Sequence, residues 1–222
     1  METGLAAALT LPFEVAARLR RARAVHPRGR SYRGTLVISA AGPPPPGEYD
    51  VVARLSKATS TPGGAPDVLG VAVRVPAAAG PVDLLFATTG LAPGARHVLC
   101  VRRSFLAGAY TTLLPYDVGG HTRVLGLVPA DPDRHVPTRL AVLDAEVTAR
   151  PLRFTLVTAG LISPWRPSGT LEIHTPIPED SEGTAAFDPQ LNNIPGLHPT
   201  GPLQTIRRLA YARSRRGRHQ PW

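Results

Sequence analysis

The sequence carries an arginine four residues before a tyrosine near its carboxyl end, at Arg207 and Tyr211. On a helix these two side chains lie on one face, and Arg218, seven residues after Tyr211, returns to that face. A guanidinium beside a phenol stabilises the phenolate, because a nearby positive charge favours the anion. A phenolate is a hard, charged oxygen ligand, and haem iron is among the centres that tyrosine holds. From this stretch alone, an iron ligand at Tyr211 competes with a basic, solvated helix whose tyrosine packs against the core.

The composition is that of one globular domain with many arginines. The 222 residues suit a single domain, 1–222, and the net charge is +9, with Lys57 as the only lysine. The aromatic content of 5% is too low for a platform that stacks single-stranded nucleic acid. Scattered arginines are better suited to an anionic small molecule, because a guanidinium fork matches a carboxylate.

The one cysteine, Cys100, excludes an intrachain disulfide and a cysteine-based zinc site. Its apolar neighbours predict a buried strand, with Cys100 as a small core residue. No window is long and apolar enough for a membrane span, and the amino terminus lacks the positive start of a signal peptide. We therefore expect a cytoplasmic protein without membrane contact.

Short apolar runs separated by turn residues predict an antiparallel sheet or barrel. The expected strands cover residues 34–39, 49–56, 69–75, 82–88, 124–128, 141–150, 153–158 and 169–174. Helices are expected over 5–24, over 105–114 and after Pro202, and a long connection over 175–203 leads to the last of them. The fold class is therefore α+β, with a barrel core and flanking helices.

Several stretches resemble, in the same order, the haem-binding core of catalases. Residues 23–29 read Arg-Ala-Val-His-Pro-Arg-Gly, similar to the family's Arg-Val-Val-His-Ala-x-Gly segment, and residues 54–56 read Arg-Leu-Ser, similar to its Arg-Phe-Ser. Residues 69–74 and 82–85 resemble two family strands, the second leading to an asparagine in the distal pocket.

The carboxyl-terminal part also resembles the family's approach to its proximal helix. The matching stretches are Trp165-x-Pro167, Phe187-Asp188-Pro189, Ile194-Pro195-Gly196 and the spacing from Leu203 through Arg207 to Tyr211. The resemblance implies a catalase-like antiparallel β-barrel with a carboxyl-terminal proximal helix.

The resemblance also implies a role for each matching residue. It makes Tyr211 the proximal ligand of a haem b iron, with Arg207 holding the phenolate, and Arg23, Arg54 and Arg218 partners of the haem propionates. It makes His26 the distal general base and Ser56 its hydrogen-bond partner. A neutral imidazole can take a proton from one peroxide oxygen and return it to the other.

The clearest departure from the family is at the distal asparagine, whose place falls on Thr88. A threonine offers one hydroxyl where asparagine offers two N–H donors and a carbonyl. We therefore expect weak disproportionation of hydrogen peroxide, with Thr88 as a catalytic-site residue.

The resemblance implies a haem-dependent oxidoreductase that uses peroxide to oxidise a small organic substrate. One alternative is a hydroperoxide isomerase or dehydratase of the allene oxide synthase type, and another is a non-enzymatic haem-binding or nucleic-acid-binding protein. The expected partners are a peroxide and a small organic substrate, with no nucleic acid and no membrane. A homodimer is the one assembly left open.

Overall fold

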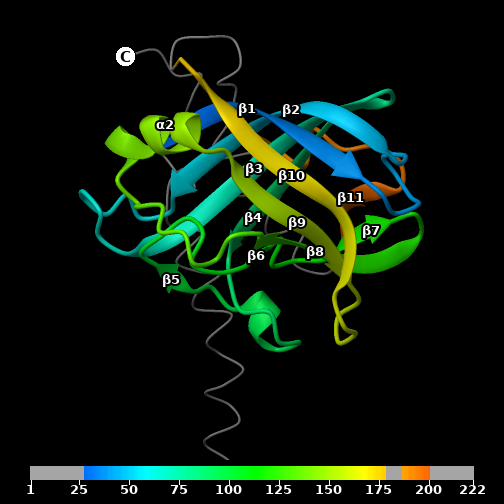
Figure 1. Ribbon diagram of the computed structural model, residues 1–222. Coiled ribbons are helices and arrows are strands. Elements are labelled where there is room, and N and C mark those ends of the chain that lie inside the picture. The colour runs from blue at the N-terminus through cyan, green and yellow to red at the C-terminus, as the bar shows by residue number, and fades with distance from the viewer. Residues whose placement is uncertain (1–27, 179–186, 201–222) are drawn as a thin grey trace, which may run out of the picture.

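The computed structural model describes residues 28–178 and 187–200 of the 222. Eight strands of this part form an antiparallel barrel in the order β8-β6-β4-β3-β2-β1-β10-β9, and pairing of β8 with β9 closes it (Figure 1). The barrel strands are β1 (Arg28–Ile38), β2 (Gly47–Lys57), β3 (Asp67–Ala77), β4 (Gly80–Thr88), β6 (Tyr110–Thr111), β8 (His121–Pro129), β9 (Leu152–Ala159) and β10 (Arg166–Ile177).

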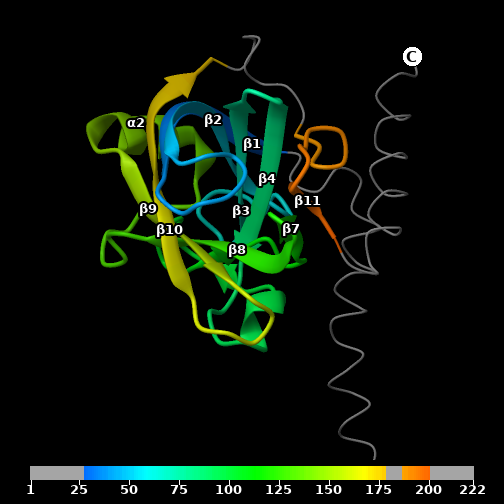
Figure 2. The same cartoon turned by 90° about the vertical axis from the view of Figure 1, so that its right-hand side faces the viewer.

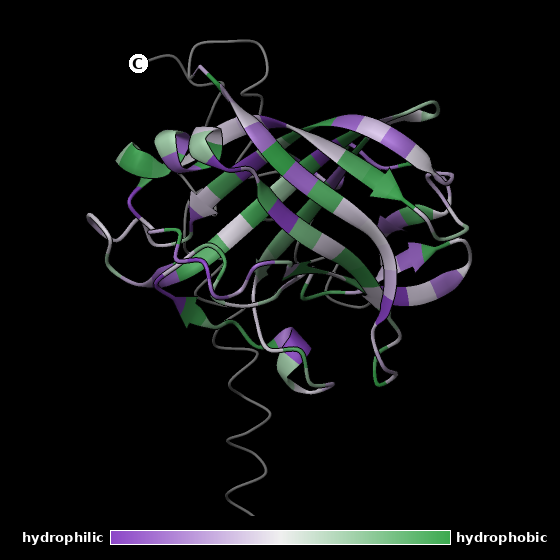
Figure 3. Cartoon of the chain, viewed as in Figure 1, coloured by the Kyte–Doolittle hydropathy of each residue, from purple (hydrophilic) through white to green (hydrophobic). Residues whose placement is uncertain are grey.

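The alternation of apolar and polar residues along the strands produces the barrel, because successive side chains point to opposite faces. In β2, Val51, Ala53 and Leu55 are buried, and in the paired β3 Val71 and Val73 are at most 1% exposed. Bands of hydrophobic and hydrophilic colour accordingly alternate along the strands (Figure 3). Every strand turns one apolar face inward, and closure leaves no long unpaired edge.

Shorter elements surround the barrel. They are η1 (Ala95–His97), β5 (Val101–Arg102), β7 (Tyr116–Val118), α2 (Leu140–Ala149) and β11 (Leu197–Pro199). Strand β5 pairs with β3, and β7 lies between β8 and β11. Helix α2 packs beside β1 and β10, where the Tyr32 hydroxyl donates to Asp144 Oδ1 at 2.8 Å.

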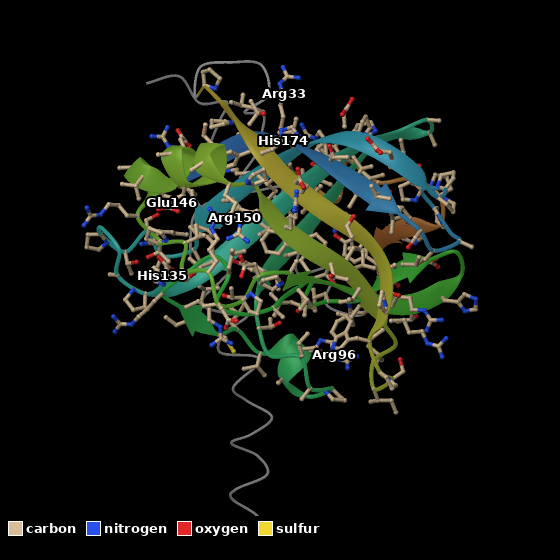
Figure 4. All side chains as sticks on the ribbon, viewed as in Figure 1. Arg33, Arg96, His135, Glu146, Arg150 and His174 are labelled. Atoms are coloured by element: carbon tan, nitrogen blue, oxygen red, sulfur yellow. The ribbon has the colours of Figure 1, made fainter. Side chains whose placement is uncertain are left out.

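A buried arginine ties η1 to the turn between β9 and β10. Arg96 is 1% exposed and donates to the carbonyl oxygens of Gly160 at 2.7 Å and Ser163 at 3.1 Å. Its guanidinium carbon lies 4.5 Å from the centre of the Trp165 ring, and Figure 4 shows Arg96 at the end of the barrel where this turn lies. Burial lowers the pKa of Arg96 from its ordinary value. These contacts make Trp165 a packing residue of the barrel end.

The predicted antiparallel barrel is confirmed, whereas the helices are confirmed only in part. Within the described residues α2 is the one α-helix, so this part of the protein is mostly β. The helices expected over 5–24 and after Pro202 lie outside the described residues. No helix of the described ranges has both the length and the apolar character needed to cross a bilayer.

Three local predictions are wrong. Residues 141–150 form most of α2 and not a strand, because Leu143 and Val147, four apart, supply one buried helix face. Residues 105–114 contain strand β6 and no helix, since pairing with β4 and β8 overrides the local pattern. Cys100 is only partly buried, and its neighbours Val98 and Val101 are 52% and 58% exposed, so this stretch is not a core strand.

Candidate functional site

The outer face of β1 to β4 carries two rows of residues that include predicted site residues. Directly opposite residues of antiparallel strands point to the same face. One row runs Gly29, Ser56, Gly70 and Ala87, and the next runs Ser31, Arg54, Ala72 and Leu85. These eight residues are named the outer-face site below.

The outer-face site is partly polar and carries mostly small side chains. Its glycines and alanines present nothing larger than a methyl group, whereas Arg54 and Leu85 are long. Ser31 and Ser56 are each 4% exposed, so their hydroxyls are withdrawn from water. A surface of small side chains with two hydroxyls and one guanidinium suits a ligand that carries negative charge.

Ser31 has the most informative polar atom of the outer-face site. Its hydroxyl oxygen is buried and makes no hydrogen bond within the described residues. Buried hydroxyls are almost always paired, because an unpaired one loses its bonds to water without replacement. The Ser31 side chain lies directly opposite Arg54, so an acceptor bound at Arg54 also falls beside this hydroxyl.

Gly29 allows β1 and β2 to approach closely beside Arg54 and Ser56. A Cβ built on Gly29 would lie 2.6 Å from the carbonyl oxygen of Leu55, 2.9 Å from Cβ of Ser56 and 3.0 Å from Nε of Arg54. The first two separations are too short for a real side chain, so a larger residue here would displace β2. The glycine that ends the segment 23–29 is therefore a packing requirement of this strand pair.

Ser56 lies in the row next to Arg54, on the same face of β2. Its hydroxyl donates to the carbonyl oxygen of Gly70 at 3.4 Å, a long hydrogen bond that costs little to exchange. The structure therefore places the two described residues, Arg54 and Ser56, on one face of β2, and the roles that the resemblance assigns to them stay predictions.

The structure does not bring Thr88 to this face. Thr88 follows Ala87, which belongs to the outer row, so its side chain points into the barrel, where it is 1% exposed. Its hydroxyl donates to the carbonyl oxygen of Cys100 at 2.6 Å and accepts from the N–H of Leu69 at 3.1 Å. Both functions of the hydroxyl are engaged, so Thr88 joins three segments of the barrel wall.

The other predicted site residues fall outside the described part of the chain. They are Arg23, His26, Arg207, Tyr211 and Arg218. Their roles stay predictions. In the described ranges, His, Cys, Asp and Glu form no group of three that could hold a metal ion. A metal with a single protein ligand needs no such group.

Asp83 organises the neighbouring part of the outer face, a role that the sequence analysis missed. Its side chain is fully buried, and it accepts from Arg74 Nε and Nη2, each at 2.7 Å. The same carboxylate accepts from the backbone N–H of Asp188 and from Asn192 Nδ2, both at 2.7 Å. The hydrogen bond to Asp83 raises the pKa of Arg74 although burial opposes it, so the guanidinium stays charged.

Asp83 thereby attaches the segment 187–200 to β3 and β4. The Phe187 ring covers the guanidinium of Arg74, whose Cζ lies 5.0 Å from the ring centre. Strand β11 of the same segment extends the contact by pairing with β7. Figure 2 shows this segment, in orange, beside β4. The resemblance had singled out both 82–85 and 187–189, and the shared hydrogen bonds explain why they occur together.

The barrel is the fold of catalases. Aligned solved structures include a fungal catalase (TM-score 0.65, 13% identity) and catalase A from Saccharomyces cerevisiae (0.65, 12%). A bacterial catalase aligns with a TM-score of 0.62 and 12% identity. These alignments cover 94%, 91% and 93% of this chain.

The chain spans only part of those proteins, 62%, 63% and 60% of their respective lengths. No family model matches the sequence, and no curated protein matches it. The likeness therefore lies in the three-dimensional fold.

Proposed function

We propose that the protein is a haem-dependent oxidoreductase of the catalase fold that uses a peroxide to oxidise a small organic substrate. The observation that carries the proposal is the buried Ser31 hydroxyl, which has no hydrogen-bond partner among the described residues, beside Arg54 on the outer face of a catalase-like barrel. The Ser31 hydroxyl needs an acceptor, and the small side chains of this face leave room for a planar group. A planar group that bears a carboxylate would meet both conditions.

The described residues fit a haem b. Gly70, Ala72 and Ala87 present no side chain beyond a methyl group, so a planar macrocycle can approach the strands closely. Arg54 offers a guanidinium for a propionate, and Ser31 offers a hydroxyl donor on the same row. Arg23 and Arg218 are the further propionate partners that the resemblance assigns.

Tyr211, with Arg207 beside it, is the proposed ligand of the iron. The positive charge of Arg207 keeps the phenolate deprotonated and therefore able to bind a metal. When bound, the haem supplies the redox chemistry with peroxide that amino-acid side chains lack.

His26 and Ser56 are proposed to handle the proton. The imidazole of His26 takes the proton from one peroxide oxygen and delivers it to the other, which makes the departing oxygen a better leaving group. The Ser56 hydroxyl is proposed to orient that imidazole.

Weak disproportionation of hydrogen peroxide follows from the β4 position in the row of Ser56, which is separated from Ser56 by Gly70 of β3. Disproportionation needs a second peroxide held by donors near the reacting centre. The outer row carries Ala87 there, and its methyl group donates no hydrogen bond, while Thr88 faces the barrel interior. We propose that an organic reductant takes the place of the second peroxide.

The visible spectrum of the purified full-length chain, reconstituted with haem, tests the proposal. We expect a Soret band at one haem per chain and the spectrum of a tyrosinate-bound ferric haem, which Tyr211→Phe abolishes. Arg166→Gln, an exposed arginine of β10, is the matched control and should keep the spectrum. No Soret band in the wild type would overturn the proposal and leave a protein without haem.

Turnover separates the proposed reaction from the alternatives. With peroxide and a phenolic reductant, His26→Ala should lower the oxidation rate by about 10²–10⁴ while haem content is unchanged. Conversion of an organic hydroperoxide without consumption of reductant would instead identify an isomerase or dehydratase. Haem binding with neither reaction would identify a non-enzymatic haem protein.

A further inference from the structure

A second candidate site lies away from the outer-face site, between the loop after β2 and the start of α2. It is a pocket of 340 Å³, lined by Gly64, Arg103, His135, Pro137, Arg139 and Val142. This volume is at the lower end of the range of small-molecule sites, which is about 300–1,000 Å³. Figure 4 shows His135 on the side of the molecule that carries α2. The pocket is named the α2 pocket below.

The polar side chains that line the α2 pocket all belong to basic residues. Arg103 and Arg139 contribute guanidiniums, His135 contributes an imidazole, and the lining contains no carboxylate. Within the described ranges, none of these three side chains forms an ion pair. Positive side chains that converge on a pocket without a counter-charge favour an anionic occupant.

Three carboxylates on the adjoining segments are held by other partners. Asp131 pairs with Arg150 at 2.6 Å, and Glu146 lies 3.7 Å from Arg134. Asp144 accepts the hydroxyl of Tyr32. A fourth, Asp133, is exposed to solvent two residues before His135 and is not part of the pocket lining.

The first turn of α2 contributes to the same wall. Arg139 is the N-cap residue with extended backbone (φ −76°, ψ 106°), and in the described chain no side chain caps this helix end. The first turn also contains no acidic residue, and Val142 of that turn lines the pocket. The Val142 N–H donates to the carbonyl oxygen of Arg139 at 3.2 Å, so the contribution of this helix end to an anion placed there is the positive end of the helix dipole.

The opposite wall of the α2 pocket is held in place before any ligand arrives. The ammonium of Lys57 donates to the carbonyl oxygens of Thr61 at 2.8 Å, Ala65 at 3.2 Å and Gly63 at 3.3 Å. The hydroxyl of Thr138 donates to the same Ala65 oxygen at 3.1 Å, which joins the loop to the residues before α2. A wall that is already ordered costs a ligand little entropy on binding.

The position of Arg103 is set by a second connection. Ser104 forms a β-bridge with Pro137, and Ser104 Oγ accepts from the N–H of Val136 at 2.9 Å. Arg103 and the segment that carries His135 and Arg139 are therefore held on adjacent backbones. The positive groups of the pocket come from two segments far apart in sequence but connected by hydrogen bonds.

We propose that the α2 pocket binds a dianionic phosphoryl group, either as free phosphate or as part of a small phosphate ester. A single guanidinium satisfies a planar carboxylate, whereas the exposed side chains of two arginines and one histidine line this pocket together with the first turn of a helix. A tetrahedral phosphoryl group has three terminal oxygens to receive them and carries about −1.5 to −2 charge near neutral pH. Pro137 and Val142 provide apolar contact for the organic part of an ester. The inference does not depend on the proposed haem chemistry.

The test is a calorimetric titration of the purified full-length chain with inorganic phosphate, phenyl phosphate and benzoate. We expect one site for the phosphoryl ligands, and benzoate should bind at least tenfold more weakly than phenyl phosphate. Equal affinity for the two phosphoryl ligands identifies free phosphate as the source, and tighter binding of phenyl phosphate identifies an ester. Benzoate binding as tightly as phenyl phosphate would overturn the phosphoryl assignment.

Variants locate the site. The double substitution Arg103→Gln and Arg139→Gln should weaken phenyl phosphate binding by at least 100-fold, and each single change by about tenfold, the loss expected for one charge-assisted hydrogen bond of about 1.5 kcal/mol. Arg166→Gln removes one exposed positive charge elsewhere and should change the affinity less than twofold. An equal loss in the control, or unchanged binding in the double variant, would show that the phosphate binds to diffuse surface charge and would overturn the proposal.

Chemical shifts in a ¹H–¹⁵N spectrum provide a second readout that does not depend on the variants. Phenyl phosphate should shift the backbone N–H signals of Leu140 to Val142, at the first turn of α2. Shifts confined to other elements would contradict the proposed location.

Discussion

The buried carboxylate of Asp83, which has no exposed side-chain surface, accepts hydrogen bonds from both Nε and Nη2 of Arg74 at 2.7 Å. The same carboxylate accepts a hydrogen bond from the backbone N–H of Asp188. One carboxylate thus joins neighbouring strands of the barrel to the segment that follows β10. Removal of one partner from a buried ion pair leaves the other charge uncompensated.

We expect Asp83→Ala to lower the free energy of unfolding by about 3–5 kcal/mol, as for other buried pairs that lose one partner. Denaturant unfolding measures the change. Hydrogen exchange of the Asp188 N–H, which loses its acceptor, should accelerate. Arg153→Ala, which breaks the exposed pair with Glu172, is the control and should cost about 1 kcal/mol or less. A loss at Asp83 no greater than in this control would contradict the role given to Asp83.

Ser31 should respond to substitution in opposite ways with and without haem. In the haem-free chain, Ser31→Ala removes a buried hydroxyl that has no described partner, so stability should be unchanged or higher. Haem affinity should fall about threefold to tenfold, the effect of one hydrogen bond of about 0.5–1.5 kcal/mol. Ser168→Ala is the matched control, because Ser168 is equally buried but donates to Leu156. Unchanged haem affinity in Ser31→Ala would remove Ser31 from the site.

The adjacent residues Ala87 and Thr88 should differ in what an introduced asparagine does. Ala87→Asn places amide donors on the outer face, in the row of Ser56 and separated from it by Gly70, and should raise oxygen evolution from hydrogen peroxide relative to oxidation of an organic reductant. Thr88→Asn breaks hydrogen bonds to Leu69 and Cys100 inside the barrel and should lower stability by about 1–3 kcal/mol. A higher oxygen yield from Thr88→Asn than from Ala87→Asn would reverse the assignment of the two faces.

Asp67 should make stability depend on pH in the acidic range. Burial alone would raise its pKa, but hydrogen bonds from the N–H and hydroxyl groups of Thr59 and Thr61 outweigh burial and hold the pKa of Asp67 below its ordinary value. The unfolded chain therefore binds the proton more tightly. The resulting stability is complete above the unfolded pKa of about 3.9 and is lost as the pH falls through the lower folded value.

The measurement for Asp67 compares the free energy of unfolding of the wild type and Asp67→Asn from pH 7 to pH 3. The advantage of the wild type should shrink below about pH 5, because protonation removes the charge that the hydrogen bonds stabilise. Asp133→Asn, at an exposed position, is the control. A difference that is constant over this range would show that the charge of Asp67 contributes nothing.

The strands were predictable because burial on one face imposes a two-residue period, as Val51, Ala53 and Leu55 show. Residues 141–150 misled prediction, because valine and threonine favour strands while the buried pair Leu143 and Val147 required a helix. Arg54 and Ser56 lie on one face of β2 because they are two residues apart in a strand that the alternation over 49–56 predicted. The sequence did not show which of Ala87 and Thr88 lies on the outer face. A shift of one residue exchanges the two faces of a strand, and only the strand pairing determines which residue faces outward.

The enclosure of Lys57 has a practical consequence for following the opening of this protein. Within these 222 residues a lysine-specific endopeptidase has a single peptide bond to cleave, that after Lys57. The side chain it must recognise is only 2% exposed and lies at the end of β2, in the barrel wall. Cleavage therefore requires β2 and its following loop to detach, and the rate of this one cut reports how often that happens.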